Sequence, residues 1–273
     1  SGTKISGVIH QSGGWPVVGG PTPAEAKARA LELQQTLLGP KGSLEGLRGV
    51  PVQKIIDVTG DIYAGMRFGA IQDAESFPRT LQQQVMDGDL PPLNIIIGTN
   101  ANESLLYIKP EASVASYLEG RVPAQRWPEV LAAAGDDLDE LATFDRLGTA
   151  VTFLCPSLTL ANAVSAAGGR AFVYRFDRVR PGFDSIGAYH GAELPYVFDR
   201  HDSWLPTEPV DRTLTRLMLD YWQGFISQGD PGGSELMAWP PWQPGDYQAV
   251  IFSEESSVMP HPDVEFCSVF SGT

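Results

Sequence analysis

The chain has 273 residues, a formal net charge of -14 at pH 7 and an isoelectric point near 4.6. Nucleic-acid binding needs clustered Lys and Arg to meet the phosphates, so this composition argues against a nucleic-acid partner. An anionic membrane surface would also repel the chain, and the longest apolar runs, 93–98 and 171–176, are only of strand length. Apolar residues make up 42% of the chain and aromatic residues 10%, which is typical of one globular domain.

Cys155 and Cys267 are the two cysteines of the chain. That number is too small for a disulfide scaffold, and their spacing does not fit a zinc site. Free thiols are the favoured interpretation, although one bridge between them stays possible, so the cellular compartment is left open. His10, His201 and His261 have no companions at ligand spacing, so the sequence predicts no metal site.

The first residues lack both an initiator Met and the charged and apolar regions of a signal peptide. We therefore expect the chain to begin inside a longer protein. Residues 7–14 form a short apolar segment that ends in glycines, which predicts a buried strand entering a turn. Such a strand needs neighbours on both sides.

The run Thr-Pro-Ala-Glu at 22–25 encodes the start of a helix. Its threonine hydroxyl fits an N-cap, its proline fits the first helical position, and its glutamate completes a capping box. This pattern predicts a helix over 23–38, followed by a short charged helix or turn over 41–50. Residues 57–89 have no strong period and are expected to be irregular surface with short strands.

Two strand-like runs, 93–98 and 170–176, are separated by helical patterns. Strands that alternate with helices are typical of a parallel sheet, so the sequence predicts an α/β fold. A further helix is predicted over 210–227, because its apolar residues recur at helical spacing and form one core-facing stripe. The stripe consists of Leu214, Leu217, Met218, Tyr221, Trp222 and Phe225.

Segment 98–104 carries a carboxylate, Glu103, in the turn directly after the first of these strands. Open α/β sheets form their active sites at the carboxyl ends of the strands, which makes Glu103 a candidate catalytic acid. The alternative is a structural role, because a glutamate at this position also caps the helix that follows.

Segment 187–198 sets His190 between small residues, in the loop after strand 170–176. Flanking glycines let a loop histidine present its imidazole to a cleft, where it serves as a base. Taken alone, such a histidine is more often an ordinary surface or hydrogen-bonded side chain, so the two motifs must be weighed together.

These motifs, taken in chain order, resemble the C-terminal half of the type B carboxylesterase family, which includes the cholinesterases. The resemblance rests on residues 9–13, strand 171–176 and the segments around Glu103 and His190. Further matches lie toward the C-terminus, at Tyr221-Trp222, Phe225, Gly229-Asp230-Pro231 and Trp239-Pro240. The resemblance implies an α/β-hydrolase fold, of which residues 1–273 form the C-terminal portion of a single domain, with a mostly parallel central sheet flanked by helices.

The resemblance also implies a Ser-Glu-His triad, with Glu103 as the acid and His190 as the base. The family's nucleophile stands in a Gly-x-Ser-x-Gly elbow, and no serine of this chain has those flanking glycines. The serine is therefore expected in a missing N-terminal portion or a complementary chain. Ser12 and Glu193 are implied to lie behind the triad acid and support it. Alternatively, Ser12 caps the turn after its strand and Glu193 forms a salt bridge in solvent.

The activity that the resemblance implies is hydrolysis of a small carboxylic ester through an acyl-enzyme, without metal or cofactor. This chain alone is expected to be inactive. Two other classes stay open: a non-catalytic, cholinesterase-like binding or adhesion module, and an inactive fragment that folds only with a partner chain. The sequence preceding this chain would separate them, because an elbow serine and oxyanion-hole glycines mark the enzyme.

Overall fold

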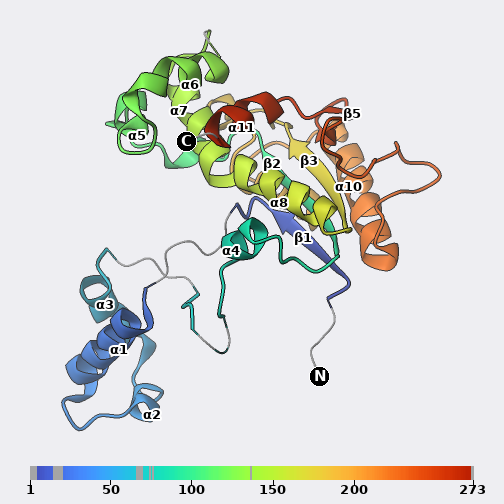
Figure 1. Cartoon of the computed structure of the whole chain (residues 1–273). Helices are drawn as coiled ribbons and strands as arrows, with labels where there is room; N and C mark the ends of the chain where they lie inside the picture. Colours follow the sequence, from blue (N-terminus) through green and yellow to red (C-terminus); the bar gives the residue numbers. More distant parts are fainter. Residues whose placement is uncertain are drawn as a thin grey trace. The chain divides into compact units, whose positions relative to one another are not determined.

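The computed structural model describes residues 5–14, 21–65, 70–73, 75, 77–135 and 137–271 (Figure 1). The chain divides into two compact units. The first unit joins Ser1–Trp15 to Gly88–Thr273, and the second unit is Pro16–Asp87. The first unit contains the sheet and every candidate site residue.

A five-stranded sheet in the order β1-β2-β3-β4-β5 forms the centre of the first unit. Its strands are β1 (Gly7–Gln11), β2 (Asn94–Asn100), β3 (Arg170–Phe176), β4 (Gln248–Phe252) and β5 (Ser257–Pro260). The first four strands pair in parallel and β5 pairs antiparallel with β4. The predicted mostly parallel sheet is therefore confirmed, and the three strands expected from the sequence are β1, β2 and β3.

The strands of the sheet differ in burial. β2 and β3 are buried on both faces, as their unbroken apolar runs predict for parallel strands. The residues of β1 are half-buried, and among the described residues β1 pairs with β2 alone. The second neighbour that the sequence predicts for β1 is thus not present among the described residues of this chain.

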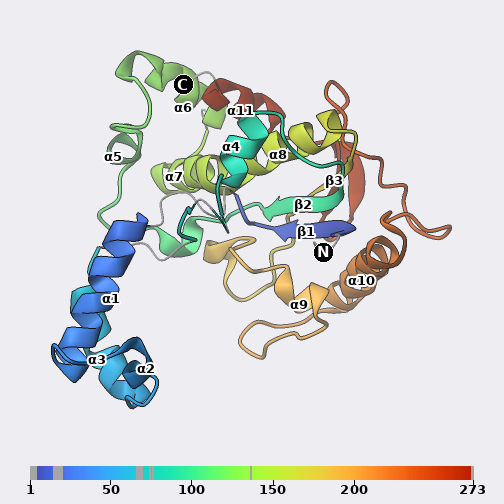
Figure 2. The ribbon, with the colours of Figure 1, turned by 60° about the horizontal axis from the view of Figure 1, so that its bottom comes forward.

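Helices cover both faces of the sheet. In Figure 2, α8 (Cys155–Ala166) lies on one side of β1 and β2, while α9 (Leu194–Val197) and α10 (Pro209–Gln228) lie on the other. The remaining helices of the unit are η1 (Leu105–Tyr107), α5 (Val114–Leu118), η2 (Ala124–Arg126), α6 (Trp127–Ala134), α7 (Glu140–Thr149), η3 (Ala150–Leu154), η4 (Asp184–Ile186) and α11 (Val264–Ser271). This is the layered arrangement that an α/β sequence requires.

Helix α10 provides much of the core beneath the sheet. The predicted helix 210–227 is confirmed with one residue more at each end. Its predicted stripe is buried except for Leu217, which is partly buried. Trp222 packs against Trp239 and Phe252, with ring centroids 6.2 and 6.0 Å apart, so the stripe acts as core.

Helices α7 and α8 are joined by η3, a π-helical turn. The resulting run, Glu140–Ala166, has the length of a membrane span, and its most apolar 18-residue stretch has a mean hydropathy of 1.4. However, 61% of its most apolar stretch is buried inside the protein, as in a core helix. The strand-length apolar runs noted in the sequence did not reveal this helix.

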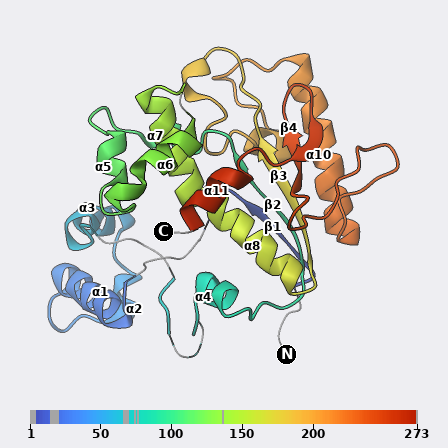
Figure 3. The ribbon, with the colours of Figure 1, turned by 45° about the horizontal axis from the view of Figure 1, so that its top comes forward.

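The two cysteines form a disulfide bond, with their Cα atoms 5.2 Å apart. The favoured expectation of free thiols is therefore wrong. Cys155 begins α8 and Cys267 lies within α11, and Figure 3 shows these two helices lying against each other. The pairing depends on this helix packing, which two isolated cysteines in a sequence do not reveal.

The second unit is helical where it is described. It contains α1 (Pro23–Leu38), α2 (Leu44–Leu47), α3 (Val52–Ile62) and α4 (Leu81–Met86). The capping box at Thr22 and the helix 23–38 are confirmed. The expected short strands in 57–89 are wrong for the described residues, since α3 and α4 occupy much of that range, and residues 66–69, 74 and 76 lie outside the description. Packing of α3 on α1 overrides the weak helix propensity of its Val and Ile residues.

Candidate active site

The carboxyl ends of β2 and β3 bring the two sequence-predicted side chains together. Glu103 follows β2, and His190 lies in the loop after β3. His190 Nδ1 is 2.6 Å from the Oε2 atom of Glu103. The expected contact between Glu103 and His190 is therefore present at the edge where parallel sheets form their sites.

Glu103 is a fully buried carboxylate, with 0% of its surface exposed. Its Oε1 atom accepts a hydrogen bond of 2.7 Å from the backbone N–H of Asn100, and Oε2 faces His190. Both oxygens are thus used inside the protein. The hydrogen bond to Asn100 joins Glu103 to the end of β2, which leaves the carboxylate one direction for its imidazole partner.

His190 is half-exposed, and the hydrogen bond to Glu103 raises the pKa of its imidazole above the ordinary histidine value, although burial acts in the opposite sense. Phe153 packs beside the ring with centroids 5.0 Å apart, and Tyr107 approaches it edge-on at 6.0 Å. With the Nδ1–H group donating to Glu103, Nε2 is the nitrogen left to accept a proton. An imidazole held in this way is suited to general base catalysis.

A second buried carboxylate, Glu193, lies next to the first. It is 2% exposed and accepts hydrogen bonds from Asn100 Nδ2 at 2.6 Å and from Gln11 Nε2 at 3.1 Å. Burial raises the pKa of Glu193, and the hydrogen bond from Asn100 opposes that rise. The expected buried polar group is present, and the alternative of a salt bridge in solvent is wrong.

Asn100 links the two carboxylates, because its backbone serves Glu103 and its side chain serves Glu193. Its side chain also donates to the carbonyl of Tyr189 at 2.8 Å. Neither Asn100 nor Gln11 was predicted from the sequence as a site residue. The available signal was position alone, since both residues end strands that point to the same edge of the sheet.

Ser12 follows β1 in a left-handed backbone conformation, with φ of 49°. Its N–H donates to the carbonyl of Gly98 at 2.9 Å, and its side chain is buried. The Oγ atom has no hydrogen-bond partner among the described residues. The structure therefore gives Ser12 no hydrogen bond to Glu103, and its supporting role stays a prediction.

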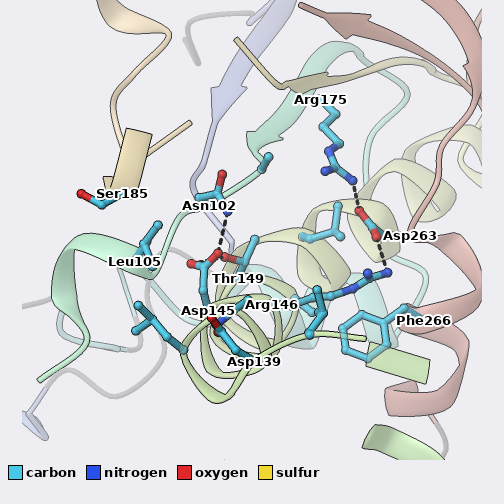
Figure 4. Close-up of a pocket in the computed structure, with 16 residues that line it drawn as sticks. Asn102, Leu105, Asp139, Asp145, Arg146, Thr149, Arg175, Ser185, Asp263 and Phe266 are labelled. Atoms are coloured by element: carbon cyan, nitrogen blue, oxygen red, sulfur yellow. Dashed lines mark hydrogen bonds and ion pairs between the residues drawn. The ribbon is translucent and has the colours of Figure 1, made fainter. Parts of the chain in front are cut away.

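A cavity of about 350 Å³ lies beside this site (Figure 4). Asn102 and Asp145 line it, while neither Glu103 nor His190 does. Asp263 lies between the guanidinium groups of Arg146 and Arg175, at 2.9 and 2.5 Å. Within the described part of the chain, no group of three or more His, Cys, Asp or Glu side chains is arranged to hold a metal ion.

Comparison with known proteins matches residues 123–269 to the carboxylesterase family. The chain is 25% identical over 260 residues to phenmedipham hydrolase of Pseudarthrobacter oxydans, covering 86% of this chain and 52% of the relative. It is 22% identical over 267 residues to para-nitrobenzyl esterase of Bacillus subtilis strain 168, covering 89% and 53%. The chain thus spans about half the length of either relative.

The fold is also similar to that of a solved carboxylesterase from Geobacillus stearothermophilus. The TM-score is 0.75 at 23% identity, covering 96% of this chain and 57% of the solved chain. This likeness, together with the layered sheet, confirms the expected α/β-hydrolase fold.

Proposed function

Because this chain belongs to the carboxylesterase family, we propose that the protein containing it hydrolyses carboxylic esters with a Ser-Glu-His triad. Glu103 is the acid and His190 is the base. The observation that carries the proposal is the 2.6 Å contact between His190 Nδ1 and the fully buried Glu103. The nucleophilic serine lies outside residues 1–273, because no serine here stands in the required elbow.

The chemistry follows from the two side chains. His190 Nε2 takes the proton of the serine hydroxyl as the serine oxygen attacks the ester carbonyl, and later returns the proton to the leaving alcohol. Glu103 stabilises the imidazolium formed in between, in agreement with the raised pKa of His190. Water then hydrolyses the acyl-enzyme. These steps consist of nucleophilic attack, proton transfer and stabilisation of the oxyanion by backbone N–H groups. The proposed mechanism uses neither metal nor cofactor.

Residues 1–273 form the C-terminal portion of one α/β-hydrolase domain in this proposal. A preceding segment or a complementary chain supplies the nucleophile and pairs with the open edge of β1. Two observations support the proposal that a further portion of the domain exists. The relatives are about twice as long as the matched region, and β1 pairs with β2 alone among the described residues. Parallel strands are usually covered and paired on both edges.

A small aromatic ester is the substrate to test first, a choice supported by the name of the relative para-nitrobenzyl esterase. The protein that includes the preceding segment is assayed with para-nitrophenyl acetate. It is then labelled with a fluorophosphonate, and mass spectrometry locates the adduct. We expect an adduct on a serine outside residues 1–273.

Two matched histidine variants test the role of His190. His190→Ala should abolish both turnover and labelling, because a serine without its base is a weak nucleophile at neutral pH. His201→Ala should keep both, since the His201 ring bonds to Thr215 and not to Glu103. An adduct on Ser12, or full labelling of His190→Ala, contradicts the proposal. A folded complete protein with neither labelling nor turnover indicates the non-catalytic binding module.

A further inference from the structure

Asn102 connects the loop that carries Glu103 to the loop that carries His190. Its backbone N–H donates to the carbonyl of Ala188 at 3.0 Å, and its side-chain Oδ1 accepts from the N–H of Ala188 at 3.0 Å. An isolated parallel bridge also pairs Asn102 with Tyr189. Asn102, the residue directly before Glu103, is therefore hydrogen-bonded twice to Ala188, which lies two residues before His190.

Gly187 permits this close approach. A Cβ atom at this position would lie 2.3 Å from Asn102 Oδ1, and the φ of Gly187 is +57°. Both observations exclude a larger residue without movement of one of the loops. The glycine allows the amide of Asn102 to contact the backbone of the histidine loop directly.

Asp145 on α7 fixes the orientation of the Asn102 amide. Its Oδ2 accepts from Asn102 Nδ2 at 2.8 Å (Figure 4). Its Oδ1 accepts from the backbone N–H of Ser104 at 3.0 Å and from Thr149 at 3.3 Å. An ionised carboxylate accepts only, so the amide must turn Nδ2 toward Asp145 and Oδ1 toward Ala188. Asp145 thereby holds the neighbours of Glu103 on both sides.

Asp145 is itself 2% exposed. Burial raises its pKa, and the hydrogen bonds from Asn102, Ser104 and Thr149 oppose that rise. The carboxylate of Asp145 therefore holds the loop that carries Glu103, and that loop is bonded to the His190 loop through Asn102. Removing one of these donors, or replacing it by an acceptor, is expected to disturb all the hydrogen bonds around Asp145.

We propose that Asn102 and Asp145 are positioning residues that set the distance between Glu103 and His190. The inference rests on the proposed function, in which that pair is catalytic. Neither positioning residue touches the reacting atoms. They act by joining the two loops, so their loss changes turnover more than substrate affinity.

Asn102→Asp is the sharpest variant, because it keeps the shape and the acceptor for Ala188 but turns a second carboxylate oxygen toward Asp145. Two carboxylates at hydrogen-bond distance cannot both be ionised without repulsion, so one holds a proton at low pH and then donates as the amide does. We expect kcat to fall by about 10–100-fold at pH 8 with KM little changed, and to recover relative to the parent protein toward pH 5.5.

Other charged groups around this pair are the same in the parent and variant proteins, so the ratio of their kcat values isolates the new carboxylate. These groups are Glu103, Asp139, Arg146, Arg175, His190 and Asp263. All measurements use the protein that includes the proposed nucleophile, after circular dichroism has verified that each variant is folded.

The double variant N102D/D145N exchanges the amide and the carboxylate, and so restores one donor and one acceptor. Its kcat should return to within a few-fold of the parent value, and its ratio to the parent should no longer depend on pH. Asn94→Asp is the matched control. Asn94 lies at the other end of β2 and donates to the carbonyl of Gly229 at 3.0 Å, so its loss should lower thermal stability without a pH-dependent change in kcat.

The outcomes separate the two proposals. If His190→Ala keeps its turnover, the proposed function fails whatever the other variants do. If His190→Ala is inactive but Asn102→Asp matches the parent at every pH, only the positioning inference is overturned. A uniform loss that the exchange does not rescue also overturns it. If Asn102→Asp does not fold, N102D/D145N alone decides, and a loss beyond about 100-fold in that folded protein contradicts the inference.

Discussion

The loops after β2 and β3 differ sharply from the turn after β1, although all three lie at the same edge of the sheet. The two loops are joined by hydrogen bonds from Asn100 to Tyr189, between Asn102 and Ala188, and between Glu103 and His190. The turn after β1 is attached through the Ser12 N–H and, at the end of the strand, through the side chain of Gln11, while the Ser12 Oγ has no hydrogen-bond partner among the described residues.

This difference corresponds to a division of the proposed triad. The acid and the base are held together within residues 1–273, whereas the nucleophilic serine is proposed to lie outside them. Buried polar groups are normally hydrogen-bonded, because an unsatisfied one is unfavourable by about 1–3 kcal/mol. The acid and base are already in contact within this chain. The Ser12 Oγ on the β1 side has no partner among the described residues, and in the proposed function the edge of β1 away from β2 pairs with the missing portion.

The largest effect is expected from Glu103→Gln in the protein that includes the nucleophile. The amide keeps the shape but can no longer stabilise the imidazolium, so kcat should fall by about 10³–10⁴-fold. Glu129→Gln is the control, since this exposed residue pairs with Arg126, away from the site, and its loss should leave turnover unchanged. Steady-state kinetics with para-nitrophenyl acetate provide the measurement. A loss below tenfold at Glu103 would remove it from the triad.

Removal of the Cys155–Cys267 disulfide tests whether the stability of the protein can be lowered without disturbing the geometry of the site. Replacing both Cys155 and Cys267 by Ala should lower the free energy of unfolding by about 2–5 kcal/mol, because the bond closes a long stretch of chain, 112 residues apart in sequence. Neither cysteine takes part in the hydrogen bonds of the two loops, so kcat should stay within a few-fold. Urea unfolding and kinetics are compared, and an equal loss in both would show that the loops depend on α11.

The pH dependence of turnover tests the contact between Glu103 and His190. Glu103 raises the pKa of His190, so the acid limb of kcat/KM should lie above the ordinary histidine value of 6.5, and Glu103→Gln should move the His190 titration to lower pH. The stability from this pair is complete below the ordinary pKa and is lost as pH rises through the raised one. NMR titration of the His190 ring measures the shift. An unchanged titration in Glu103→Gln would contradict the assigned cause.

Ser12→Ala is expected to have the smallest effect. Its hydroxyl has no partner among the described residues, so removing it should lower kcat by less than about tenfold, and by much less than Glu103→Gln does. Kinetics of the two variants, measured side by side, decide the order. A loss at Ser12 equal to that at Glu103 would mean that the turn after β1 contributes as strongly as the two loops.

Local sequence signals accounted for much of the fold. The run at 22–25 encodes its helix through neighbouring residues, and the apolar segments 93–98 and 170–176 identify β2 and β3 because buried parallel strands tolerate few polar residues. The missed elements depend on distant partners. Val52–Ile62 is helical because it packs on α1, and β5 is a strand because it pairs with β4.

The candidate site was likewise predictable where its signals are local, and was missed where residues depend on distant partners. Glu103 and His190 stand in recognisable segments, each following a predicted strand. Asn100 and Asn102 carry no such signal, because an asparagine at a strand end is ordinary until the second loop is brought against it. Asp145 lies 42 residues beyond Glu103 in the numbering of the chain, and only the packing of α7 brings it to the site.

The π-helical turn Ala150–Leu154 determines where this region tolerates a change in length. Hydrogen bonds in such a turn reach one residue further than in an α-helix, so the turn accommodates one additional residue. Deleting one residue there would let the run become α-helical throughout, and because the turn absorbs that residue, α8 would keep its orientation relative to α7. Deleting a residue between Asp145 and the turn, with the turn kept, would instead rotate α8 by about 100° relative to Asp145. Such a chain could not keep both the disulfide and the contact of Asp145 with the glutamate loop.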